Sequence, residues 1–86
     1  MSNNKYYYRA EIYFGDNGTV YGMKREEFKD CINELNHFIR SYSGNHVNKV
    51  GIFKRNVSDD KEIVTCRKNN RWAKLDSNMY YKYENN

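Results

Sequence analysis

The sequence predicts a two-layer α+β domain in which one amphipathic helix packs on an antiparallel sheet. Two runs of β-forming residues precede the one long stretch with helical periodicity, and three more follow it. This ββαβββ order is typical of an antiparallel sheet with its helix on one face. We expect 86 residues to form a single domain, 1–86, that is frayed at 1–5 and 84–86.

The first hairpin is predicted from strict alternation over residues 6–14. Its even-numbered residues share one face, and the other face carries Tyr7, Arg9, Glu11 and Tyr13. A Gly-Asp-Asn-Gly turn leads to the return strand. A two-residue Asn-Gly turn pairs Phe14 with Tyr21, whereas a three-residue loop pairs Phe14 with Val20. We favour the first register because it buries more apolar bulk.

The helix is predicted over residues 25–43, where apolar residues recur at helical spacing. Acidic residues in the first turn and Arg40 in the last turn match the helix dipole. Gly44 suits the left-handed conformation that ends many helices, but Lys24 is a poor N-cap. The apolar stripe consists of Phe28, Cys31, Ile32, Leu35, Ile39 and Tyr42.

A second hairpin over residues 62–75 is the most informative stretch of the chain. It follows a strand at 49–57 and a turn at 58–61. A type I′ turn at Asn69-Asn70 would pair Arg67 with Trp72 and Thr65 with Lys74. Those four residues would then share one face, opposite Val64, Cys66, Ala73 and Leu75. The only tryptophan would thus lie on a cationic face, which indicates a binding surface.

The candidate binding residues come from this hairpin and from the sheet face that one helix leaves uncovered. They are Trp72, Arg67, Lys68, Arg71, Lys74 and Thr65 of the hairpin, with Tyr7 and Tyr13 of the first strand. The alternative for Trp72 is structural: it packs against Met79–Tyr83, a tyrosine-rich segment that is either a last strand or a docking tail.

The sequence has no motif that indicates catalysis or a bound cofactor. It lacks a phosphate loop, a dinucleotide fingerprint and a nucleophile elbow. Cys31 and Cys66 fall on apolar faces, and with His37 and His46 they lack zinc-site spacing. We therefore expect no metal, no cofactor and no enzymatic activity.

Charge and composition point to the partner class. The net charge of +4 lies entirely in residues 44–86, which favours an anionic partner. Asn, Lys and Tyr are abundant and Pro is absent, as in products of AT-rich phages and mobile elements. We expect a cytoplasmic binding protein that acts in a bacterial host. It would antagonise a host protein that handles nucleic acid, such as a defence nuclease, in the way that anti-CRISPR proteins do.

The alternative function is direct binding of single-stranded or duplex nucleic acid by the basic hairpin. Under the antagonist hypothesis, the partner is a host protein with an acidic or nucleic-acid-binding surface. We expect no membrane association, since no apolar stretch is long enough to span a bilayer. A monomer is expected, or a homodimer paired through the 6–14 or 79–83 strand edge.

Overall fold

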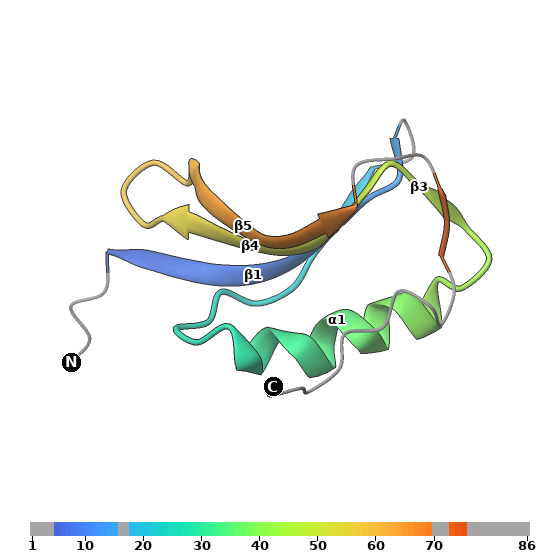
Figure 1. Ribbon diagram of the computed structural model, residues 1–86, viewed down its shortest axis with the longest axis horizontal. Coiled ribbons are helices and arrows are strands. Elements are labelled where there is room, and N and C mark those ends of the chain that lie inside the picture. Colours follow the sequence, from blue (N-terminus) through green and yellow to red (C-terminus); the bar gives the residue numbers. More distant parts are fainter. Residues whose placement is uncertain (1–4, 16–17, 70–72, 76–86) are drawn as a thin grey trace.

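A computed structural model of the chain describes residues 5–15, 18–69 and 73–75, with the backbone alone for 64–69 and 73. Four antiparallel strands form a sheet in the order β2-β1-β4-β5, and β3 and β6 form a separate two-stranded sheet. The predicted α+β class is confirmed (Figure 1). The elements are β1 (Tyr6–Tyr13), β2 (Thr19–Tyr21), α1 (Lys29–Ser41), β3 (His46–Val47), β4 (Lys49–Asn56), β5 (Glu62–Asn69) and β6 (Ala73–Lys74).

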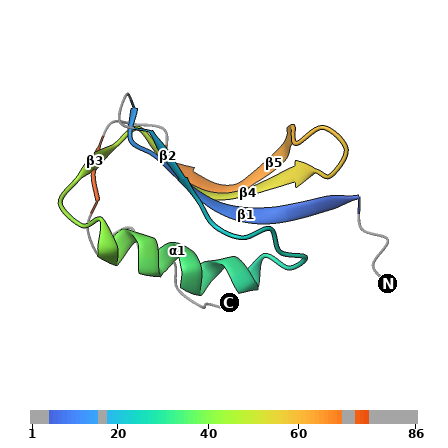
Figure 2. The ribbon, with the colours of Figure 1, turned by 180° about the vertical axis from the view of Figure 1, so that it is seen from behind.

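The core lies between α1 and one face of the four-stranded sheet. Figures 1 and 2 show α1 along this face, and no described helix or strand covers the opposite face. Both sheets contribute to the same core, because Val47 of β3 and Leu75 after β6 are fully buried in it. The other buried members are Ala10, Ile12, Cys31, Ile32, Leu35, Ile39, Val50 and Ile52.

The helix is shorter than predicted, but its apolar stripe is confirmed. Phe28 and Tyr42 flank the four buried stripe residues and pack against the core. Arg25 lies outside the helix because its backbone exchanges hydrogen bonds of 2.7 and 2.8 Å with Tyr8 of β1. The N-cap residue is Phe28 and not Lys24 as predicted, and no side chain caps this helix N-terminus. Gly44 has the expected positive φ, +94°.

Both predicted registers of the first hairpin are wrong. The structure pairs Ile12 with Val20, and Phe14 N–H donates to the Gly18 carbonyl at 2.8 Å. This register puts Gly22 beside Ala10, whose carbonyl accepts its N–H at 2.8 Å. A Cβ on Gly22 would lie 2.5 Å from Glu34 Oε1 of α1, so glycine here lets the helix side chain reach the strand.

The predicted hairpin over 62–75 is also wrong, since β5 and β6 belong to different sheets. β5 pairs with β4, and two register shifts, at Ile52/Phe53 and at Lys54/Arg55, interrupt that pairing. β6 instead pairs with β3. Leu75 accepts the Gly44 N–H at 3.0 Å and donates to the Asn45 carbonyl at 2.8 Å. These bonds, and the burial of Leu75, outweigh the local turn preference of the two asparagines.

Two other expectations concern strand edges and the membrane. β1 lies between β2 and β4, so the expected homodimer edge at 6–14 is not an edge of the sheet. The other expected homodimer edge, residues 79–83, lies outside the described residues. In the part of the chain that the structure describes, no helix is long and apolar enough to cross a membrane.

Candidate functional site

The face of the four-stranded sheet that points away from α1, here called the open face, carries aromatic and charged side chains. It is placed by alternation, because Ala10, Ile12, Val50 and Ile52 point into the core and their neighbours point the other way. Figure 1 shows this side of β1, β4 and β5 without a covering element among those described. The open face consists of Tyr7, Arg9, Glu11, Tyr13, Tyr21, Lys49, Phe53 and Arg55.

A buried carboxylate lies at the centre of the open face. Glu11 is fully buried, although no described element covers it. Arg55 of β4 holds it in a bidentate ion pair, with Nε and a terminal amino group each 2.7 Å from a carboxylate oxygen. Arg9 donates to Glu11 through Nε at 3.0 Å, and the Tyr13 hydroxyl donates at 2.5 Å. Neighbouring side chains therefore shield this charge from water.

The hydrogen bonds keep Glu11 ionised. Burial alone would raise the pKa of this carboxyl, but the bonds from Arg55, Tyr13 and Arg9 outweigh burial and lower the pKa. Burial and the bond to Glu11 raise the pKa of the Tyr13 hydroxyl, so this phenol stays neutral. The bond to Glu11 likewise raises the pKa of Arg55. One carboxylate is thus shared by two guanidinium groups, and the cluster has a net positive charge.

Cations lie over the aromatic rings of the open face. The Arg9 guanidinium carbon is 4.2 Å from the centroid of the Tyr21 ring. Lys49 Nζ is 5.0 Å from the centroid of Tyr13 and 5.8 Å from that of Phe53. These distances allow cation–π attraction. The faces of these rings are therefore partly occupied by side chains of the same molecule.

Tyr7, which was predicted to be an exposed binding residue, is buried. Only 4% of its surface is exposed, and its hydroxyl donates to Asp60 Oδ1 at 2.9 Å. Lys24 Nζ lies 4.8 Å from the centroid of its ring. Asp60 follows the β4–β5 turn and is 53 residues from Tyr7 in the sequence. This long-range contact, which alternation within one strand cannot predict, helps to bury the tyrosine. Tyr13, the other predicted tyrosine, is half-buried.

The structure does not assemble the predicted cationic hairpin face. Lys74 is exposed on β6 and therefore belongs to the two-stranded sheet. Thr65, Arg67 and Lys68 lie on β5, where only their backbone is described. A register shift falls between the partners of Thr65 and Arg67, so simple alternation does not relate these two residues. Trp72 and Arg71 lie outside the described residues.

The sequence interpretation missed the ion cluster as a site. The face that carries Arg9 and Glu11 was predicted correctly, but these two residues were not singled out. Opposite charges two positions apart among tyrosines were the available signal. Arg55 could not be added, because its position opposite Tyr7 depends on the β1–β4 register. Lys49 joins the site in the same way, opposite Tyr13.

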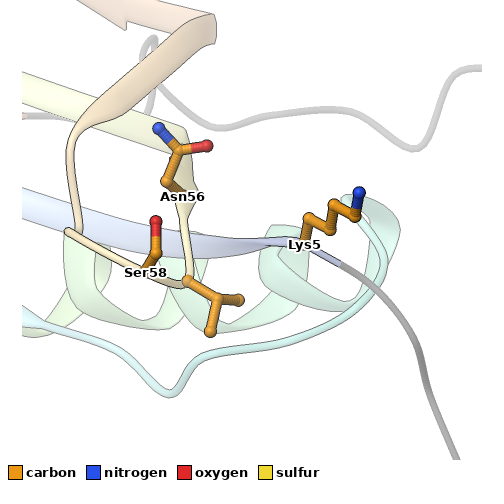
Figure 3. Close-up of a pocket in the computed structure, with 4 residues that line it drawn as sticks. Lys5, Asn56 and Ser58 are labelled. Atoms are coloured by element: carbon orange, nitrogen blue, oxygen red, sulfur yellow. The ribbon is translucent and has the colours of Figure 1, made fainter.

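A pocket of about 360 Å³ lies at the end of β4 (Figure 3). Lys5, Asn56, Val57 and Ser58 line it. Lys5 is the one charged residue of this lining, so the pocket does not indicate a particular ligand. Among residues 5–15, 18–69 and 73–75, no three His, Cys, Asp or Glu side chains are grouped so that they could hold a metal ion.

Comparisons with known proteins identify no relative. No protein-family model, curated protein or solved structure matches the chain.

Proposed function

We propose that this chain is a small non-enzymatic binding protein that occupies the surface of a protein partner through its open face. The observation that supports this most is the Glu11 cluster. It fixes two arginines and a tyrosine on a sheet face that no described element covers. Side chains that are already ordered lose little conformational entropy on binding, which favours recognition of another folded surface.

The residue types on the open face favour a protein partner over a nucleic acid. Tyrosine and arginine are enriched at interface hot spots, and Tyr21 is 52% exposed beside Arg9. Stacking on unpaired bases needs free ring faces, but Tyr7 is buried and Tyr13 lies under Lys49. Tyr7 and Tyr13 are therefore poorly suited to the base stacking that the nucleic-acid alternative gave them, whereas Trp72, its main stacking residue, lies outside the described residues.

The proposed partner is a host protein that handles nucleic acid and has an acidic surface. The net charge of +4 supports an acidic surface, since attraction speeds association. The abundance of Asn, Lys and Tyr, whose codons are AT-rich, supports an accessory protein of a phage or mobile element that acts in the bacterial cytoplasm. Such a protein works by occupying a functional surface, as antagonists of defence nucleases do, and needs no catalytic residue.

Affinity capture with matched variants tests this proposal. The immobilised wild-type chain is exposed to bacterial host lysate beside Tyr21→Ala and Val57→Ala, which both shorten an exposed apolar side chain. Only the first lies on the open face. We expect the wild type and Val57→Ala to retain the same protein. Tyr21→Ala should bind it at least about tenfold more weakly, as loss of a hot-spot residue does.

Titration with labelled mixed-sequence oligonucleotides separates the two partner classes. We expect no saturable anisotropy change with single-stranded or duplex DNA at micromolar protein and physiological salt. Saturable binding that weakens steeply with salt, and is lost in Tyr21→Ala, would contradict the proposal and favour direct nucleic-acid binding.

A further inference from the structure

We infer that Arg9 is the anion-binding point of the open face and that it receives a carboxylate from an acidic polypeptide segment of the partner. This inference rests on the proposed function and gives the partner a specific chemistry.

The two arginines of the cluster differ in how many of their donors are used. Arg55 donates through Nε and a terminal amino group to Glu11, and its other amino group donates to the Asp60 carbonyl at 3.0 Å. Arg9 donates to Glu11 through Nε only. Within the described residues its two terminal amino groups have no hydrogen-bond acceptor. Arg55 is thus a structural residue, whereas the terminal amino groups of Arg9 have no acceptor among the described residues.

The surroundings of Arg9 make those unused donors significant. Its side chain is only 16% exposed, so solvent reaches only a small part of its surface. Poorly exposed polar groups without a partner are rare in folded proteins and often mark a place for water or a ligand. The Tyr21 ring packs against the guanidinium, with its centroid 4.2 Å from the guanidinium carbon. Arg9 is therefore held in place by Glu11 and Tyr21, while its terminal amino groups are unused within the part of the chain that the structure describes.

The local charge favours an anion at this point. Arg9 shares Glu11 with Arg55, so the cluster lacks one negative charge. Lys24 borders the same Tyr7 ring as Arg9, since Arg9 and Lys24 are 5.4 and 4.8 Å from its centroid. Lys24 is 59% exposed and is paired with Asp60 at 3.9 Å. The uncompensated charge is therefore that of the cluster around Glu11, and it favours an anion at Arg9.

A carboxylate on a polypeptide fits this point better than a phosphate of nucleic acid. A planar guanidinium binds a carboxylate or a phosphate through two parallel hydrogen bonds, and the terminal amino groups of Arg9 provide both donors, so the choice between the two anions depends on the neighbouring side chains. A protein segment also gains apolar contact with the exposed Tyr21. A nucleic-acid strand would find only Tyr21 exposed for stacking, with one face of that ring already occupied by Arg9, because Tyr7 is buried and Tyr13 lies under Lys49.

The test uses a fluorescein-labelled oligoglutamate peptide, with oligoglutamine and oligothymidylate of equal length as comparison probes. We expect saturable binding of oligoglutamate to the wild-type chain and none of oligoglutamine. Arg9→Gln should weaken it about tenfold. The control Lys29→Gln removes the same charge from a 70% exposed side chain on α1 and should change the affinity less than twofold.

An NMR titration of the wild-type chain gives an independent readout. We expect oligoglutamate to shift the Arg9 side-chain Nε–H signal and the backbone signals of Tyr21 and Lys24. This readout decides the question if Arg9→Gln does not fold by circular dichroism. Shifts confined to α1, or equal affinities of the Arg9 and Lys29 variants, would overturn the inference. Tighter binding of oligothymidylate than of oligoglutamate would overturn the choice of a carboxylate.

The capture experiment separates failure of this inference from failure of the proposed function. If folded Arg9→Gln retains the captured protein while Tyr21→Ala loses it, the assignment to Arg9 is wrong and the binding face stands. If both variants retain the protein, both proposals fail.

Discussion

At the scale of single residues, Glu11 determines how the open face is organised. It joins β1 to β4, because its ion-pair partner Arg55 lies 44 residues away in the sequence. Removing one partner of a buried ion pair costs far more than the intact pair contributes, since the other charge is left without compensation. Glu11 is therefore both a strand-linking residue and the support for Arg9 and Tyr13.

We predict that Glu11→Ala lowers the free energy of unfolding by about 3–5 kcal/mol, because two arginines lose their shared carboxylate. Urea denaturation followed by circular dichroism measures this change. The matched control is Glu26→Ala, which removes an exposed carboxylate and should change stability by less than about 0.5 kcal/mol. Equal stabilities of the two variants would show that the cluster does not support the fold.

The pH dependence of stability follows from the same residue. The pKa of Glu11 is lower in the folded protein than its usual value of 4.5, so the unfolded chain binds a proton more readily. The stabilisation is therefore fully present above pH 4.5 and is lost as the pH falls through the lower folded pKa. Urea midpoints between pH 7 and pH 3 should fall more steeply for the wild type than for Glu11→Gln. Parallel curves would contradict this assignment.

At the scale of elements, periodic patterns were predictable and pairings were not. The α1 stripe and the β1 alternation could be predicted because each depends on neighbours within one element. The β1–β2 register could not, because contacts from other elements, such as Glu34 of α1 beside Gly22, cannot be inferred from the local sequence. β6 was assigned to the wrong partner because the burial of Leu75 overrides the Asn69-Asn70 turn signal.

The candidate site shows the same limit. Alternation was enough to place Arg9, Glu11 and Tyr13 on one face. Their contacts with Arg55 and Lys49 depend on the β1–β4 register, and the burial of Tyr7 depends on Asp60 after the β4–β5 turn. A surface built from several strands becomes visible only when the strand order is known.

The contact between α1 and the segment that follows β2 gives a prediction at this scale. Glu34 accepts the Met23 N–H at 3.2 Å and an Arg25 side-chain bond at 3.4 Å. Gly22→Ala would push the Glu34 carboxylate away, so we expect a loss of about 1–2 kcal/mol in unfolding free energy. In a Glu34→Ala background the same substitution should cost less than about 0.5 kcal/mol.

Denaturation of the wild type, both single variants and the double variant completes this cycle. Additive losses would mean that the glycine is required for some reason other than the approach of Glu34.

At the scale of the whole molecule, the two sheets and the helix share one core. Val47 and Leu75 bring the β3–β6 sheet into contact with residues from α1 and the larger sheet. We therefore predict a single cooperative unfolding transition. Midpoints from far-UV circular dichroism, which reports secondary structure, and from tyrosine absorbance, which reports packing, should coincide. A second transition would show that the small sheet melts independently.

The two register shifts of β5 affect whether molecules of this protein can associate edge to edge at high concentration. β5 is an outer strand of the four-stranded sheet, and an outer strand is a template on which further strands can stack into fibres. Stacking needs an even row of N–H and C=O groups, and each shift interrupts that row. We therefore expect these shifts to make β5 a poor template for polymerisation.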